Sequence, residues 1–270
     1  MHLTAEDIAR IIAARPDFDP ATFDIEAFVD ALDDPTVNDL AGRIIEAEEA
    51  NRFNLFERLF PDDGPLRRAL YPKHVEFFGA GLTHQQRLFM AGNRVGKTMA
   101  GGYETTCHLT GRYPHWWPGR KFRRPGPWWV AGDTNETTRD ILQLTLLGKV
   151  CWVGNVKTFD GSGIIPRETI GKVTWKQGVP DLADNVFIKH VTGGWAQLGF
   201  KSYDQGRRVF QGTAKQGIWL DEECPMDVYN ESMIRLATTR GLMMLTFTPL
   251  LGLSDVVLSF LPKEWQPEAA

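Results

Sequence analysis

Short apolar runs alternate with helical patterns and glycines from about residue 71 onward. This alternation is typical of a layered α/β fold. Before that point, apolar residues recur every three or four positions between prolines, which favours short helices. We therefore predict a lid-like helical N-terminal subdomain over residues 1–70, an α/β core over residues 71–262 and a C-terminal tail over residues 263–270.

Within the core, the apolar runs predict strands and the periodic segments between them predict helices. Two of the runs flank Gly193 and Gly194, which predicts a β-hairpin. Pro225 suits the opening of a helix, and Gly241 suits the C′ position at its end. The predicted strands cover residues 87–91, 127–133, 186–192, 195–202, 217–223 and 243–249, and the predicted helices cover residues 97–110, 136–148 and 225–240.

The net charge of −4 conceals an uneven distribution along the chain. Residues 1–50 hold 13 acidic residues and 3 arginines, a net charge of −10, which leaves 21 acidic and 27 basic residues, or +6, in the rest. A mildly basic body can meet nucleic acid, although a solvated surface explains such an imbalance as well. The charge distribution therefore permits a nucleic-acid partner without requiring one.

Neither a membrane nor a disulfide framework is expected. No apolar run approaches the roughly 20 residues that span a bilayer, and the acidic start lacks a signal-type apolar stretch. The three cysteines, Cys107, Cys151 and Cys224, form no CxxC pair. An odd number without paired spacing predicts buried free thiols in a reducing compartment.

The stretch AGNRVGKT at residues 91–98 follows an apolar strand and precedes a helical pattern. A glycine-bearing turn that enters a helix presents backbone N–H groups to a phosphate. Lys97 would reach the β- and γ-phosphates, and Thr98 would ligate Mg²⁺. The stretch departs from GxxxxGK[ST] because Ala91 stands at the first glycine position, with Gly92 one place later. On its own the triplet is also consistent with a surface lysine in a turn.

A second motif, IWLDEE, ends the predicted strand over residues 217–223 with three acids. The carboxyl edge of an open α/β sheet is where ligands bind. Asp221 would hold Mg²⁺ through water, and Glu222 would orient and deprotonate an attacking water. Glu223 is expected to face solvent. A solvated strand end would also explain acids considered alone, so this assignment depends on the phosphate loop.

The run MMLTFTP supplies a third candidate feature, because Thr246 and Thr248 stand near its end. In P-loop ATPases with a catalytic glutamate, the strand after the acidic one lies between it and the loop strand. Both threonines would then stand beside the γ-phosphate and sense its loss. The alternative is that threonines simply suit a β-strand that Pro249 ends.

With AGNRVGKT, IWLDEE and TFTP in this order, the chain resembles the ATPase portion of the large terminase subunit of tailed bacteriophages. The likeness extends over roughly residues 71–262 and includes LTHQQRLF, CHLTGRYPHWWPG and SYDQGRRVFQG. It implies an α/β P-loop NTPase three-layer sandwich with a mostly parallel central sheet and a small N-terminal helical subdomain. It also implies ATP and Mg²⁺ as ligands.

The resemblance extends the set of candidate site residues. An arginine inside the loop is common in this family, which suggests Arg94 as a γ-phosphate contact, with a surface or capping arginine as the alternative. A glutamine upstream of the loop reads adenine, and the spacing leaves Gln85 and Gln86 both open. The predicted catalytic residues are Glu222, Arg94 and Lys97, the metal ligands are Thr98 and Asp221, and the nucleotide contacts are Gly92, Asn93, Val95, Gly96, Lys97, Thr98, Met99, Gln85, Gln86 and Thr248.

Several basic residues are weaker candidates for contacts with DNA or with a neighbouring subunit. Arg207 and Arg208 lie in SYDQGRRVFQG. A further cluster combines basic side chains with aromatic ones, a combination that grips a phosphodiester backbone, although a solvated basic loop is the simpler account. Its members are Arg120, Lys121, Arg123, Arg124, Trp116 and Trp117.

The resemblance implies a motor that couples ATP hydrolysis to translocation of double-stranded DNA into a procapsid. Its implied partners are DNA, the portal protein, the small terminase subunit and further copies of this chain in a ring, in the host cytoplasm and transiently on the procapsid. Family members also carry a C-terminal nuclease, which we do not expect in this sequence. The alternatives are a helicase-like P-loop DNA ATPase and a nucleotide-binding assembly module with vestigial hydrolysis.

Overall fold

The structure is a computed structural model that describes residues 39, 42, 52–249, 252 and 254–262. The chain divides into two compact units, Met1–Arg52 and Phe53–Ala270. The helices predicted before residue 52 and the predicted tail over residues 263–270 fall almost entirely outside the described residues. The account below therefore concerns the second unit.

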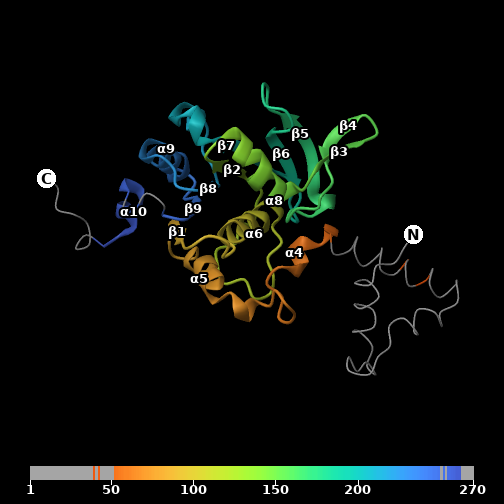
Figure 1. The fold of residues 1–270 in the computed structure, drawn as a ribbon, viewed down its shortest axis with the longest axis horizontal. Coiled ribbons are helices and arrows are strands. Elements are labelled where there is room, and N and C mark those ends of the chain that lie inside the picture. The colour runs from red at the N-terminus through yellow and green to blue at the C-terminus, as the bar shows by residue number, and fades with distance from the viewer. Residues whose placement is uncertain (1–38, 40–41, 43–51, 250–251, 253, 263–270) are drawn as a thin grey trace. The chain divides into compact units, whose positions relative to one another are not determined.

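A mixed, mostly parallel sheet of seven strands forms the centre of this unit (Figure 1). The strands are β1 Gln86–Met90, β2 Pro127–Gly132, β3 Val150–Val153, β4 Val156–Phe159, β5 Ile170–Trp175, β6 Ala183–Lys189, β7 Trp195–Ser202, β8 Gly217–Asp221 and β9 Leu242–Phe247. The sheet order is β1-β9-β8-β2-β7-β6-β5, while β3 and β4 form a separate hairpin. Strands β1, β9, β8, β2 and β7 are parallel, and β6 is antiparallel to both β7 and β5. Strand β9 therefore lies between the acidic strand β8 and the loop strand β1, as expected for a P-loop ATPase with a catalytic glutamate.

Helices connect the parallel strands. The helical segments are α4 Leu55–Arg58, η1 Arg68–Leu70, α5 Pro72–Ala80, α6 Lys97–Thr110, α7 Asn135–Thr137, η2 Thr138–Gln143, α8 Leu144–Leu147, η3 Arg167–Thr169, η4 Tyr203–Gln205, η5 Arg207–Phe210, α9 Met226–Ala237 and α10 Asp255–Phe260. Segments α7, η2 and α8 are consecutive, and η2 is a π-helical turn inside them. None of the described helices is long and apolar enough to cross a bilayer.

Both faces of the sheet are buried, and alternate residues of each strand supply the two cores. Trp128 and Trp219 enter one core, which also contains residues of α6 and α8. Their strand neighbours Trp129 and Ile218 enter the other core, which also contains residues of α9 and α10. The continuous apolar character of β2 and β8 follows from this burial, and it confirms the predicted three-layer α/β architecture.

Most of the predicted core elements are present, and several details differ. The hairpin of β6 and β7 is confirmed, with Lys189 opposite Trp195. Helix α9 ends at Ala237 rather than at residue 240, and the positive φ in the turn belongs to Arg240 at +48° instead of Gly241. The pattern missed β3, β4, β5 and α10, and it missed α5 because nine residues are too few to establish a helical period.

The predicted boundary at residue 70 also differs from the observed division between Arg52 and Phe53. The side chains of Phe56, Leu59 and Phe60 are buried in the same core as α6. Residues 53–70 therefore pack as part of the α/β unit. Of the three cysteines, which form no disulfide, Cys107 and Cys224 are buried as predicted, whereas Cys151 is only half-buried.

Helix α6 lies close against the sheet at Gly101. A Cβ atom built there would lie 2.3 Å from the indole of Trp219, which is fully buried in β8. We expect Gly101→Ala to lower the free energy of unfolding by about 1–3 kcal/mol through overpacking, despite the better helix propensity of alanine. Urea unfolding monitored by circular dichroism would measure this change.

The matched control for this prediction is Gly79→Ala in α5, where the new Cβ would meet only Pro118 at an ordinary 3.6 Å. We expect it to be neutral or stabilising by about 0.5–1 kcal/mol. Equal effects of the two substitutions would show that the contact between α6 and Trp219 is not tight.

Candidate functional site

The loop over residues 91–96 connects β1 to α6 at the carboxyl edge of the sheet. Its backbone turns sharply, because Gly96 has φ +82° immediately before the first residue of α6. Arg94 also adopts a left-handed conformation, with φ +62°. Such values cost a non-glycine residue about 1–2 kcal/mol, so this conformation is maintained by its surroundings.

Lys97 already faces the inside of this loop. Its Nζ donates hydrogen bonds to the carbonyl oxygen of Gly92 at 2.6 Å and to Oγ1 of Thr248 at 2.9 Å. The Thr248 hydroxyl in turn lies 2.7 Å from Oδ1 of Asn93. The loop, the lysine and the end of β9 thus form one hydrogen-bonded group, as expected for a lysine held ready for an anion.

The loop and the acidic strand meet at Thr98. Its hydroxyl lies 3.1 Å and 3.3 Å from the two carboxylate oxygens of Asp221 and donates to them. The Thr246 hydroxyl donates to Oδ1 of Asp221 at 2.5 Å and accepts a hydrogen bond from Nε1 of Trp219 at 2.7 Å. Two motifs more than a hundred residues apart therefore share a single contact, which is the geometry predicted for the phosphate loop and the acidic strand.

Burial is the main cause of the shifted pKa of Asp221. It raises the pKa of this carboxyl to about 7, while the hydrogen bond from Thr246 acts in the opposite direction and neighbouring Glu222 raises the pKa further. A buried carboxylate of this kind needs a cation to remain ionised at neutral pH. Asp221 therefore has the environment of a metal ligand.

Glu222 lies just past the end of β8 and is exposed. Its φ is +64°, and its N–H donates to the carbonyl oxygen of Thr246 at 3.0 Å. Partial burial raises its pKa, Lys97 lowers it and Asp133 raises it. A raised pKa brings a carboxylate closer to neutral pH, where a general base is most effective.

Oxygen donors in the site suit Mg²⁺. Magnesium is commonly bound by one or two protein oxygens together with waters and phosphate oxygens. Thr98 and Asp221 supply two such oxygens in contact with each other. The described residues contain no group of three or more His, Cys, Asp or Glu side chains that could hold a metal ion. The donor set therefore fits a magnesium ion that arrives with a nucleotide.

Two residues at this edge were not predicted from the sequence. The Tyr203 hydroxyl donates a hydrogen bond to the backbone carbonyl oxygen of Asp221 at 2.8 Å. It also lies 3.4 Å from the backbone carbonyl oxygen of Glu222. Asp133 follows β2, which pairs with β8, and its charge raises the pKa of Glu222. Only the parallel register brings these residues to the site, so no local sequence signal could have identified them.

The structure does not bring Gln85 and Gln86 to the loop. Both stand at the start of β1, whereas the loop follows its end. The Gln86 side chain accepts a hydrogen bond from the Tyr229 hydroxyl of α9. The Gln85 carbonyl accepts one from the N–H of Met243 at 2.8 Å. Their role in reading adenine stays a prediction.

The expectation that Glu223 faces solvent is wrong. Both of its carboxylate oxygens are buried, and neither has a hydrogen-bond partner among the described residues. The chain turns at Glu222, where φ is positive, and this turn directs the next side chain inward.

The predicted basic cluster has structural roles for several of its members. Arg120 stacks on the ring of Phe122 and donates to the carbonyl oxygen of Arg240. The Trp117 ring is buried and stacks with Phe78 at a centroid distance of 5.0 Å. Among the basic residues proposed above as DNA or subunit contacts, the exposed ones are Lys121, Arg123, Arg124, Arg207 and Arg208.

Comparison with known proteins adds to this geometry. The family described as the terminase large subunit, T4likevirus-type, N-terminal, matches residues 88–270. The chain is 35% identical over 257 residues to the large terminase subunit of Salmonella phage P22, in an alignment covering 88% of this chain and 48% of that protein. It thus spans about half the length of this relative.

Two structures of the large terminase from the thermophilic bacteriophage D6E are also similar. Their TM-scores are 0.44 and 0.42 at 11% and 13% sequence identity. Each comparison covers 70% of this chain and 48% of the other, and the second structure is a complex with ADP.

The raised pKa of Asp221 predicts how stability depends on pH. Because its folded-state pKa is about 7 against an ordinary 3.8, the folded protein binds more protons than the unfolded one between these values. Ionisation of Asp221 therefore destabilises the fold as pH rises from about 4 to 7. We expect Asp221→Asn to exceed the parent protein in free energy of unfolding at pH 8 by up to about 4 kcal/mol, and by much less at pH 5.

Urea unfolding in the presence of EDTA would measure both proteins at the two pH values. Asp140→Asn is a suitable control, because this exposed carboxylate is paired with Arg139 and its pKa is lowered. The same stability difference between Asp221→Asn and the parent at pH 5 and pH 8 would contradict the electrostatic account.

Proposed function

This chain belongs to the terminase large-subunit family and contains its N-terminal ATPase region, and we propose that it hydrolyses Mg²⁺-ATP and couples hydrolysis to the movement of double-stranded DNA. The contact between Thr98 and Asp221 is the observation that carries the proposal, because it joins a phosphate loop to an acidic strand. P-loop ATPases require both elements around one magnesium triphosphate. The family membership supplies the DNA-packaging context.

In the proposed reaction, each side chain has a distinct task. Lys97 exchanges its hydrogen bonds to Gly92 and Thr248 for bonds to phosphate oxygens. Thr98 and Asp221 hold Mg²⁺, which neutralises charge on the phosphates when it is bound. Glu222 accepts the proton of the attacking water, and its raised pKa suits this task. Arg94 is the candidate contact to the γ-phosphate.

Strand β9 offers a path from the nucleotide to the rest of the protein. Thr248 bonds to Lys97 and Asn93, while Thr246 bonds to Asp221. A phosphate that takes Lys97 releases Thr248. The end of β9 therefore responds to the presence of the γ-phosphate, as proposed for a coupling strand.

The partners that we propose follow from family membership. They are double-stranded DNA, the portal protein, the small terminase subunit and further copies of this chain arranged in a ring, in the host cytoplasm and transiently on a procapsid. Exposed cations such as Arg207 and Arg208 are available for DNA phosphates or for a neighbouring subunit.

The direct test of hydrolysis compares ATP turnover by the parent protein, Lys97→Ala and Glu222→Gln. We expect Glu222→Gln to lower kcat by roughly 10²- to 10⁴-fold, because it removes the general base. We expect Lys97→Ala to lose nucleotide affinity as well, because it removes the cation that faces the phosphates. A coupled assay of ADP release gives both quantities.

The control is Glu223→Gln, which removes the carboxylate of Glu223 and leaves that of Glu222 in place. We expect its turnover to be close to that of the parent protein. Equal rates in all four proteins would reject hydrolysis at this site. Nucleotide binding without turnover, even with DNA present, would favour an assembly module. Strand separation on a forked duplex in the absence of procapsids would favour a helicase-like ATPase.

A further inference from the structure

We propose that the indole N–H of Trp219 is a positioning group for the magnesium site, because it orients the Thr246 hydroxyl, which in turn holds the carboxylate of Asp221. Trp219 lies two residues before Asp221 in β8, and Thr246 stands opposite Asp221 in β9. The inference rests on the proposed function, since it concerns how firmly Asp221 can hold the Mg²⁺ of Mg²⁺-ATP. Trp219 acts only through Thr246.

Strand register brings the three side chains to one face of the sheet. Residues two positions apart on a strand point to the same face, so Trp219 and Asp221 share the face of β8 that packs against α6. Thr246 lies on that face as well, because Met244, two residues before it, is buried in the same core. Trp219, Asp221 and Thr246 are 0%, 4% and 1% exposed. Water therefore does not compete for the hydrogen bonds between them.

The hydrogen bonds between these side chains can run in only one direction. An indole N–H is a donor only, whereas a threonine hydroxyl has one hydrogen to donate and can also accept. Nε1 of Trp219 lies 2.7 Å from Oγ1 of Thr246 and donates to it. The hydrogen of that hydroxyl is left for Oδ1 of Asp221, at 2.5 Å. Trp219 thus makes Thr246 a fixed donor to a carboxylate, which is the stronger kind of hydrogen bond.

This fixed donor decides how the Asp221 carboxylate is turned. The last torsion of an aspartate side chain is broad, so the partners of the carboxylate set its orientation. Thr246 bonds to Oδ1, whereas the Thr98 hydroxyl is nearer to Oδ2, at 3.1 Å against 3.3 Å to Oδ1. Oδ2 is therefore the oxygen that is left for a cation shared with Thr98. Groups that orient a metal ligand in this way commonly change metal affinity by about 10- to 100-fold.

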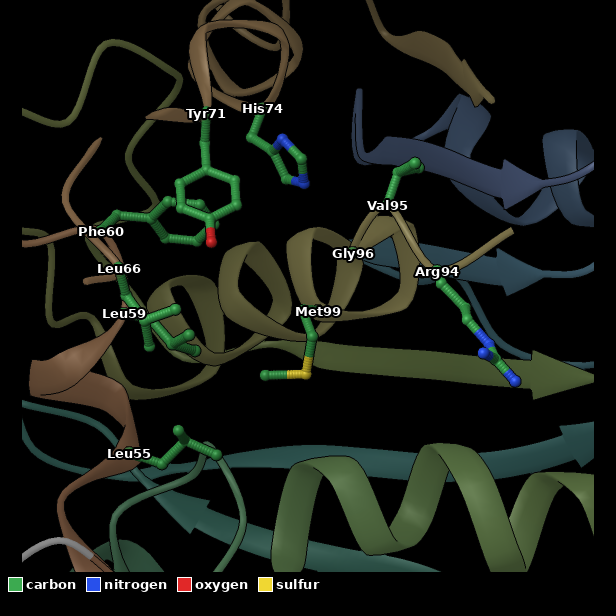
Figure 2. Close-up of a pocket in the computed structure, with 10 residues that line it drawn as sticks. All are labelled: Leu55, Leu59, Phe60, Leu66, Tyr71, His74, Arg94, Val95, Gly96 and Met99. Carbon is green, nitrogen blue, oxygen red and sulfur yellow. The ribbon is translucent and has the colours of Figure 1, made fainter. Parts of the chain in front are cut away.

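Helix α6 makes room for the indole at the atom that donates. A Cβ atom built at Gly101 would lie 2.4 Å from Nε1 of Trp219. Gly101 follows Thr98 by three residues, so both lie on the same side of the helix. Met99, between them in the chain, lies on another side and lines a pocket beside α5 (Figure 2). One side of α6 therefore admits Trp219 and brings Thr98 to Asp221.

The indole N–H and the Thr246 hydroxyl are polar groups in an otherwise apolar part of the two strands. Their fully buried neighbours in β8 and β9 are Ile218, Leu220, Leu245 and Phe247. A buried indole N–H needs an acceptor, and Thr246 could supply it without any further role. In that case, removing either polar group would leave the affinity for Mg²⁺ unchanged.

The test measures how much Mg²⁺ strengthens the binding of ATP, by isothermal titration calorimetry with ATP in Mg²⁺ and in EDTA. The ratio of the two dissociation constants separates the metal site from the contacts between the phosphates and the loop. We expect Trp219→Phe to lower this ratio roughly 2- to 10-fold, because one neutral hydrogen bond is lost. We expect Thr246→Val to lower it roughly 10- to 100-fold, because the carboxylate loses its donor.

Two further variants identify the hydroxyl as the link. Thr246→Ser keeps the hydroxyl and should restore most of the ratio that Thr246→Val loses. The double variant Trp219→Phe/Thr246→Val should equal Thr246→Val alone, because contacts that act through one another are not additive. Thermal unfolding monitored by circular dichroism would confirm that each variant folds.

Trp128→Phe is the matched control. Trp128 is 1% exposed and lies in the same core as Trp219, but it donates its indole N–H to Oε1 of Gln216 at 3.2 Å. Gln216 immediately precedes β8, at the opposite end of this strand from Asp221. We expect this control to keep the ratio within about twofold of the parent, although it loses a similar volume from the core.

A parental ratio in folded Trp219→Phe, an equal loss in Trp128→Phe or additive losses in the double variant would overturn the inference. Equal losses in Thr246→Ser and Thr246→Val would do the same, because the shape of the side chain and not its hydroxyl would then matter. If the parent protein binds ATP equally well in Mg²⁺ and in EDTA, or not at all, the proposed function itself fails, and the parent alone reveals this.

Discussion

The hydroxyl of Thr98 against the carboxylate of Asp221 is the contact on which the rest of the site depends. It exists because β1, β9 and β8 are adjacent and parallel, so that each strand delivers its following residues to the same edge. Parallel strands of this kind require helical crossovers, and α6 and α9 supply them on opposite faces. The sheet order is therefore the physical reason that two motifs far apart in the chain form one site.

The same edge concentrates unfavourable features that the fold has to maintain. Arg94 and Glu222 both have positive φ, and Asp221 is buried with a pKa raised to about 7. Strain at functional positions persists where the surrounding structure fixes the conformation. Here the fully buried β8 and the hydrogen bonds from Thr246 and Tyr203 fix it. If the site were relaxed in the absence of a ligand, its carboxylates would be exposed to water. A water-exposed carboxylate interacts more weakly with a metal ion than a buried one does.

The sequence predicts well those features that a short segment determines by itself. The loop at residues 91–98, the acid-tipped β8 and the hairpin of β6 and β7 all have local signals, and all are present. It predicts less well what depends on packing. Tyr203 and Asp133 reach the site only through strand register, and the inward direction of Glu223 follows from one backbone angle. The predicted domain boundary differs from the observed division because Phe56, Leu59 and Phe60 have the apolar spacing of a separate helical subdomain. Their side chains are instead buried in the core that contains α6.

The phosphate loop is held from two sides, and the two sides lead to different parts of the molecule. On one side, the hydrogen bond between Asn93 and Thr248 joins the loop to the end of β9, the strand next to β1 in the sheet, and α10 follows β9 in the chain. On the other side, the imidazole of His74 from α5 lies close to the backbone of Val95 and Gly96. A ligand that moves the loop must change its contacts on both sides together. The loop is consequently a segment through which events at Thr248 and events at α5 can influence each other without a change in the sheet.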